Sequence, residues 1–206
     1  MYKNLREIII ATGNRGKYKE IFEYLSDLPF ELKSLADFDI DTSSLIEDGK
    51  TYKENALIKA KFFYDVLGET VISDDSGIIV EAFKDELGVY TRRWGAGENV
   101  SDTEWIEFFL KRMDKEKNKE AYFQSCVCLY NEKLNIEEYF YGECVGTILN
   151  SLDVDIIDGL PLSSIFIPKG YDVVHSAMPV DQKNLISHRG KALKKLRDYL
   201  LNFSAN

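Results

Sequence analysis

The chain has 206 residues, 45% of them hydrophobic, so it can bury a full core as one domain, 1–206, with two closely joined lobes. Its net charge of −9 argues against binding a nucleic-acid polymer, but a mononucleotide can still bind through a divalent metal and a few lysines. Because no run approaches the roughly 20 apolar residues of a membrane helix and the N-terminus is polar, we expect a cytoplasmic protein without a membrane partner.

The first part of the chain is expected to alternate strands and helices. Glu7–Thr12 is short, β-branched and followed by glycines, which predicts a buried strand. Lys17–Leu25 is expected to be a helix and Phe30–Leu35 a second strand. Apolar residues on one face predict a helix over Thr51–Leu67, ended by Gly68.

The rest of the chain mixes strand pairs with helices. Strands are expected at Glu69–Ser73 and Ile78–Ala82, on either side of Asp74–Gly77. Ser101–Glu104 is a capping box that opens a helix to about Met113. Two long antiparallel strands and a final amphipathic helix should follow. This order predicts an α/β fold with a long mixed β-sheet flanked by helices. The last three elements are expected at Ala121–Tyr130, Ile136–Val145 and about Gly190–Phe203.

The cysteines carry no evident chemistry. An odd count fits no disulfide framework, and neither histidine has a metal-ligand spacing to a cysteine. We therefore expect small buried thiols at Cys126, Cys128 and Cys144.

The first chemical motif lies where the first strand meets the first helix. Its glycines allow the backbone to approach an anion closely, and the helix N-terminus behind it offers unpaired N–H groups. The same residues also suit an ordinary strand-to-helix turn. The candidate phosphate-binding residues are Thr12, Gly13, Asn14, Arg15, Gly16 and Lys17.

The second motif is Asp74-Asp-Ser-Gly77. Adjacent carboxylates at a strand end suit Mg²⁺, and one of them can activate water. Ser76 can then hydrogen-bond a phosphate or a sugar. Asp, Ser and Gly are equally favoured in simple turns, so a turn remains the alternative at this point.

Two further segments are polar. In the third motif, Lys59 shares a helix face with Asn55 beside an apolar stripe, so it can line a groove or be a solvated lysine. The carboxylates of Glu47 and its neighbours can supply further metal ligands. The fourth motif places Lys183, His188 and Arg189 just before the last helix, where they can form an anion or base pocket. Arg189 can instead pair with a surface acid, and His188 can cap the helix.

Together these four motifs, in this order, resemble the inosine-triphosphate pyrophosphatase family over nearly the whole chain. The resemblance implies two lobes with a central nucleotide groove, usually in a homodimer. It also implies Mg²⁺-dependent attack of water on a nucleoside triphosphate, which gives the monophosphate and pyrophosphate. The matching segments are Thr12–Lys17, Glu54–Ala56 with Lys59-Ala60, Asp74–Gly77 and Ser187–Gly190.

The resemblance also implies roles for single residues. Asp75 would be the general base or a metal-linked carboxylate, and Glu47 and Asp75 would be Mg²⁺ ligands. Asp74 and Glu54 would support them, and Lys17 would join Asp74 and Asp75 in catalysis. Substrate contacts would come from the phosphate loop Thr12–Lys17 and from Lys59, Ser76, Lys183, His188 and Arg189.

One segment departs from the family. Where the family carries Gly-Phe-Gly-Tyr-Asp-Pro, this chain has Gly159-Leu-Pro-Leu-Ser-Ser164. Leu160 takes the place of the aromatic residue that stacks on the purine, and Ser163 takes the place of the acid that helps to read it. Base–aromatic stacking is worth about 1–3 kcal/mol, so the base-reading half of the site is altered.

Three interpretations remain open. The leading one is a pyrophosphohydrolase acting on inosine- or xanthosine-type triphosphates. The second is the same chemistry on a different or modified nucleotide, which fits the altered loop. The third is a nucleotide-binding regulatory protein without turnover, although such a protein has no chemical need for paired carboxylates beside a phosphate loop.

Overall fold

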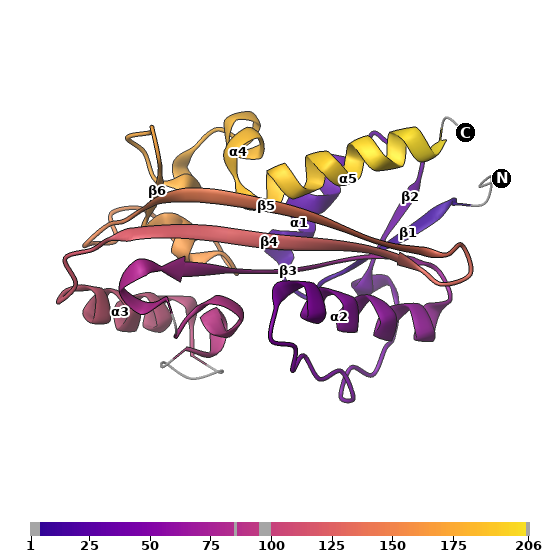
Figure 1. Ribbon diagram of the computed structural model, residues 1–206, viewed down its shortest axis with the longest axis horizontal. Coiled ribbons are helices and arrows are strands. Elements are labelled where there is room, and N and C mark those ends of the chain that lie inside the picture. The colour runs from indigo at the N-terminus through magenta and orange to yellow at the C-terminus, as the bar shows by residue number, and fades with distance from the viewer. Residues whose placement is uncertain (1–4, 85, 95–99, 205–206) are drawn as a thin grey trace.

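The computed structural model describes residues 5–84, 86–94 and 100–204. A six-stranded sheet with the strand order β2-β1-β3-β4-β5-β6 runs through the molecule (Figure 1). The strands are β1 (Glu7–Ala11), β2 (Glu31–Ser34), β3 (Thr70–Val80), β4 (Glu120–Asn131), β5 (Ile136–Ile148) and β6 (Phe166–Pro168). The helices are α1 (Arg15–Leu25), α2 (Tyr52–Leu67), α3 (Asp102–Met113), α4 (Val180–Ile186) and α5 (His188–Ser204), and short 3-10 turns include Glu81–Phe83, Pro161–Ser164 and His175–Ala177.

The sheet is mixed. β1 is parallel to both β2 and β3, whereas β3, β4, β5 and β6 pair antiparallel. The pairing of β1 with β3 ends at Ala11 and Ser73, while β3 continues to Val80 with β4 as its partner. The loop after β1 therefore begins beside Asp74, because β1 stops where β3 goes on.

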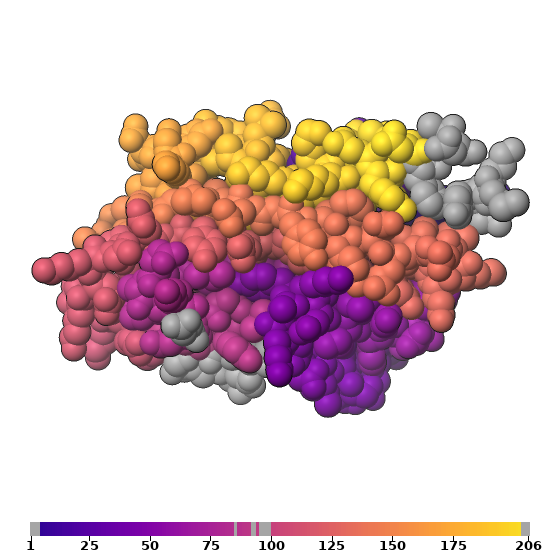
Figure 2. All heavy atoms as spheres, in the orientation of Figure 1, coloured from indigo at the N-terminus to yellow at the C-terminus, as the bar shows by residue number. Residues whose placement is uncertain are grey.

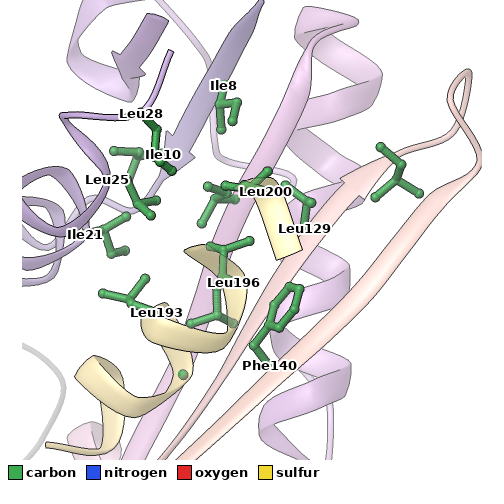
Figure 3. Packing of buried hydrophobic residues seen from close by; sticks show 14 of the residues in the cluster. Ile8, Ile10, Ile21, Leu25, Leu28, Leu129, Phe140, Leu193, Leu196 and Leu200 are labelled. Atoms are coloured by element: carbon green, nitrogen blue, oxygen red, sulfur yellow. The ribbon is translucent and has the colours of Figure 1, made fainter. Parts of the chain in front are cut away.

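Buried apolar side chains cover both faces of the sheet. On one face, α1 and α5 pack on β1, β4 and β5 through aliphatic residues such as Ile21, Leu193 and Leu196 (Figure 3). On the opposite face, α2 packs through Ala56, Ala60 and Phe63. This is the periodicity that the sequence shows, since a helix buries one stripe against a sheet.

A third buried cluster lies at the far end of the long strands and includes residues of α3, among them Trp105, Ile106 and Phe109. α2 and α3 lie on the same side of the sheet, beneath opposite halves of β3 (Figure 1). The β4–β5 hairpin extends along the whole molecule between α5 and the two helices of the other face (Figure 2). The shared sheet thus joins two packed regions that meet between α2 and α3.

Local signals fix the helix ends. The side chain of Asn14 caps α1 by accepting a hydrogen bond from the Lys17 N–H at 3.0 Å. Thr51 and Ser101 each open a helix with a reciprocal capping box. Gly68 ends α2 with a φ of 71°, a left-handed conformation that suits glycine.

The structure confirms the α/β class, the mixed sheet and most elements expected from the sequence. Three expectations were wrong. Asp74–Gly77 is not a turn between two strands, because it pairs with β4 residue by residue inside β3. The second expected strand ends at Val80, and Glu81–Phe83 forms a 3-10 turn. The final helix starts at His188, so Lys183 belongs to a separate helix, α4.

Within residues 5–84, 86–94 and 100–204, no helix is long and apolar enough to cross a membrane. Cys126, Cys128 and Cys144 are buried free thiols, as expected.

Candidate active site

A cavity of about 1120 Å³ opens between the two packed regions. Its walls come from the phosphate loop, the loop before α2, α2 itself, the middle of β3, the start of α3, residues 158–163 and the start of α5. The cavity exceeds the usual 300–1,000 Å³ of a small-molecule site, so it has room for a nucleotide.

The phosphate loop forms one wall. Thr12, Gly13, Asn14 and Lys17 line the cavity, and the Thr12 hydroxyl accepts a hydrogen bond from the Asn14 N–H at 3.2 Å. Asn14 also donates from Nδ2 to the Gly159 carbonyl at 2.9 Å, so its side chain joins the loop to the opposite wall. Arg15 instead lines a neighbouring hollow of about 420 Å³, together with apolar residues such as Phe38 and Phe63.

Asp74 is the centre of a buried ion cluster. Its Oδ2 lies 3.2 Å from Lys17 Nζ and 3.2 Å from Arg189 Nε. Arg189, which is only 2% exposed, also pairs with Glu20 and donates to the Ser76 hydroxyl at 3.1 Å. Arg189 therefore pairs with the buried Asp74 and the partly exposed Glu20.

The cluster controls the charge of its members. Burial alone would raise the pKa of Asp74, but Lys17 and Arg189 outweigh it and hold this pKa well below its usual range. Burial opposes the charge of Arg189 too, and Glu20 with Asp74 raises its pKa above the usual value. Both groups therefore stay ionised, and the Asp74–Arg189 pair connects β3 to the start of α5.

Asp75 lies on the opposite side of β3 and lines the cavity. Asn55 Nδ2 donates to its Oδ2 at 3.1 Å, and the Ser76 N–H donates to its Oδ1 at 3.0 Å. Asn55 is fixed in turn by accepting from the Gly49 N–H at 2.8 Å. Burial raises the pKa of Asp75, although Lys17 and Lys59 act against this. A carboxyl with a raised pKa beside a cavity suits general base catalysis.

The residues expected to bind Mg²⁺ lie on the same cavity. Glu47 and Asp75 both line it, and Glu47 forms an ion pair with Lys59. In the described part of the chain, no three acidic, histidine or cysteine side chains converge on one point. Mg²⁺ is usually held by one or two carboxylates, water and the phosphates of a substrate.

Another part of the cavity wall is mainly apolar and aromatic. Leu160 packs against the backbone at Gly16, where a Cβ would lie 2.9 Å from Leu160 Cγ. Ser163 is buried, and its hydroxyl donates to the Leu160 carbonyl at 2.6 Å. His188 stacks on Phe123 with their rings 4.9 Å apart. Leu160, Ser163 and His188 all line the cavity together with Trp105 and His175.

The structure brings most of the predicted site residues together. Lys59, Ser76 and the members of the ion cluster meet around one cavity, although Asp74 itself lies behind its wall. Lys183, on α4, is not among the residues that line it within the described chain. Glu54 caps α2, where its carboxylate accepts hydrogen bonds from the N–H groups of Lys50 and Thr51.

Other site residues were not identified from the sequence. Glu20 lies three residues after Lys17 on α1. Residues with this spacing share a helix face, so the spacing indicates that Glu20 lies near Lys17. Asn55 was placed beside Lys59 but was given no role. Trp105, Phe123 and His175 gave no local signal, because the fold alone brings them to the cavity.

The chain matches known proteins over nearly its whole length. The sequence profile of the Ham1 family matches residues 8–199. Proteins named dITP/XTP pyrophosphatase from Geobacter sulfurreducens and Bacillus cereus are 36% and 34% identical to it, each over 199 residues. These alignments span 95% of this chain and 97% and 95% of the relatives.

Solved structures agree with this result. The Ham1 protein of Staphylococcus aureus superposes with a TM-score of 0.79 at 30% identity, over 96% of this chain and 99% of that one. A nucleoside-triphosphatase, dITP/XTP pyrophosphatase, from Mycobacterium abscessus gives a TM-score of 0.68 at 28% identity, over 92% and 98% of the two chains.

Proposed function

Because this chain belongs to the Ham1 family, we propose that it hydrolyses an inosine- or xanthosine-type nucleoside triphosphate to the monophosphate and pyrophosphate. We further propose that the reaction requires Mg²⁺. The observation that carries the proposal is that Thr12–Asn14, Lys17 and Asp75 line one cavity together with aromatic residues. A phosphate loop, a carboxylate and a ring-binding surface are what hydrolysis of a nucleotide requires.

At the phosphate end, Lys17 supplies a cation and the start of α1 supplies backbone N–H groups. The ion pair with Asp74 holds the ammonium of Lys17 beside the cavity, so Asp74 acts as a positioning residue. Lys59 adds a second cation on the α2 side. These charges neutralise the negative charge that develops on the triphosphate in the transition state.

Asp75 accepts the proton of the attacking water. Its raised pKa makes it a stronger base than an exposed aspartate, and Asn55 keeps its carboxylate oriented. If Asp75 is instead a metal-linked carboxylate, it would hold Mg²⁺ together with Glu47, and the ion would supply charge neutralisation on the phosphates. Glu47 also forms an ion pair with Lys59, so the candidate metal ligand and the second cation lie together on this side of the cavity.

The altered loop supports a second candidate substrate. Leu160 packs against Gly16, and the Ser163 hydroxyl bonds to the Leu160 carbonyl, so neither offers an aromatic face or a charge to a base. A different or modified base is therefore the alternative substrate for the same chemistry. The whole chain is proposed to act as a single domain and as a homodimer, which sedimentation equilibrium tests.

The decisive experiment measures pyrophosphate release from a panel of nucleoside triphosphates with Mg²⁺ and with EDTA. We expect release that requires Mg²⁺ and is fastest with inosine or xanthosine triphosphate. A preference for another base would favour the alternative substrate. Nucleotide binding without release from any member of the panel would instead support the regulatory protein without turnover.

A further inference from the structure

Three residues that line the cavity each carry a ring nitrogen with no hydrogen-bond partner within the described part of the chain. These nitrogens are Trp105 Nε1, His175 Nε2 and His188 Nδ1, and all three atoms are shielded from solvent. Native proteins leave few buried polar atoms unsatisfied, because such an atom loses its bonds to water without replacement. Three such atoms in residues around one cavity are candidates for contact with a ligand that enters it.

Trp105 is the most informative of the three. It is 1% exposed and stacks on Phe109, with the rings 5.3 Å apart and 17° from parallel. Packing therefore fixes the orientation of its indole. The indole nitrogen can only donate a hydrogen bond, so its missing partner must be an acceptor.

The position of Trp105 relates it to the altered loop. It lies three residues after Asp102 on α3, and Asp102 accepts a hydrogen bond from the Gly159 N–H at 2.8 Å. It also belongs to the same buried cluster as Leu162. The indole thus lies beside the segment that lacks the aromatic residue and the acid.

The neighbouring rings are compatible with a flat, neutral ligand. The ring of Phe123 contacts both imidazoles, at 4.9 Å from that of His188 and 6.5 Å from that of His175. Burial lowers the pKa of His175 to about 4, and burial with the nearby Arg189 lowers that of His188 well below its usual value. Both imidazoles are therefore neutral at pH 7. Each then has one ring nitrogen that donates a hydrogen bond and one that accepts.

We propose that Trp105 is a specificity-determining residue, whose indole N–H donates to a carbonyl oxygen of the purine base. The proposal rests on the proposed function and adds to it the residue that recognises the carbonyl group of the base. An exocyclic amino group at that position would place a donor against a donor, and the site would reject it.

Trp105→Phe tests the proposal, because phenylalanine keeps an aromatic ring for packing and removes the N–H. The measurement is kcat/KM for pyrophosphate release from inosine triphosphate and from purine riboside triphosphate, which lacks the carbonyl. For inosine triphosphate we expect a loss of about tenfold, the usual effect of one hydrogen bond in a buried site. For purine riboside triphosphate we expect little change. An equal loss for both substrates, or no loss for either, would overturn the proposal.

Trp94→Phe is the matched control. Trp94 is also buried and aromatic-packed, but its Nε1 already donates to Glu86 at 3.0 Å and it does not line the cavity. This variant should keep the substrate preference of the unmodified protein. A shift in preference as large as that of Trp105→Phe would attribute the effect to general packing and would overturn the proposal.

A binding measurement separates the proposal from the proposed hydrolysis and remains available if Trp105→Phe does not fold. In Trp94→Phe, Trp105 is the remaining tryptophan of the two in the chain, so its fluorescence reports on this wall. The probes are the α,β-imido triphosphates of inosine and of purine riboside, which resist cleavage. Tighter binding of the inosine probe with a change in Trp105 emission supports the proposal even without turnover. Equal binding of both probes, or no binding of either, contradicts it.

Discussion

Asp74 and Asp75 are adjacent and chemically identical, yet the structure gives them opposite surroundings. Successive side chains of a strand point to opposite faces, so Asp74 meets Lys17 and Arg189 while Asp75 meets the cavity and Asn55. The cations lower the pKa of Asp74, whereas burial raises that of Asp75. One carboxylate is thus a fixed anion and the other is available as a base.

Replacing Asp75 with asparagine should therefore affect the reaction far more than the fold. We expect Asp75→Asn to lower kcat by about 100-fold or more, the usual effect of losing a general base. The melting temperature should change by only about 4 °C or less, since burial already disfavours the charged form. Pyrophosphate release and thermal unfolding check this, and near-normal turnover would exclude Asp75 as the base.

Asp74→Asn is the matched comparison. It leaves Lys17 and the buried Arg189 without their shared anion, so it should destabilise the protein by about 3–5 kcal/mol in urea unfolding. If the two variants had the same stability, the division of roles between the neighbouring carboxylates would be wrong.

At the scale of elements, the sequence predicts single helices better than the pairing between strands. Capping signals and apolar stripes located α2 and α3 because these signals are local. Asp74–Gly77 was misjudged because its residues favour turns in isolation. In the fold, this segment lies inside β3. The ten residues from Val71 to Val80 each pair with a residue of β4, and this pairing keeps the segment extended. Non-local pairing of this kind cannot be derived from local composition.

Asn14 joins two such elements. Its Oδ1 caps α1 and its Nδ2 bonds to the Gly159 carbonyl, so one side chain connects the phosphate loop with the loop at residues 158–163. Asn14→Ser should keep the cap, because serine is a good N-cap residue, and should lose the connection. We expect KM to rise by about fivefold, with stability lowered by about 1 kcal/mol.

Asn14→Ala separates the two contributions, because it removes the cap as well. Steady-state kinetics and urea unfolding of both variants provide the check. A KM for Asn14→Ser equal to that of the unmodified protein would show that the connection to Gly159 does not position the substrate.

At the scale of the whole molecule, pH should act through the two histidines of the chain, both of which are buried. In the folded state the pKa of His175 is about 4 and that of His188 is well below its usual value. An unfolded histidine has a pKa of about 6.5, so the unfolded chain binds more protons below that pH. The stability that these groups provide is therefore present above about pH 6.5 and declines as pH falls toward 4.

Urea unfolding at pH 7.0, 6.0 and 5.5 measures this effect. Below pH 6.5 each histidine should contribute a slope approaching about 1.4 kcal/mol per pH unit. His175→Phe should remove one of the two contributions and make the pH dependence shallower. Parallel curves for the variant and the unmodified protein would contradict this account, and the comparison cancels the titration of all other groups.

The candidate site was recognised from the sequence only where its residues are contiguous. The Thr12–Lys17 loop and the pair Asp74-Asp75 are short motifs, so their chemistry is visible in the printed order. Trp105 and His175 are 70 residues apart in the chain, and only the folded sheet brings them to one wall. The pairing of Arg189 with Glu20 also joins residues that are far apart in the chain, so the sequence does not show the two as partners.

The pairing of Arg189 with Asp74 spans 115 residues, and its pairing with Glu20 spans 169. During synthesis, β1, α1 and β3 emerge from the ribosome long before α5 does. Until α5 docks, Asp74 lacks its arginine and the cavity lacks His188 and Arg189. A growing chain of this protein therefore cannot complete its nucleotide site, and substrate capture begins only after nearly the whole polypeptide has been made.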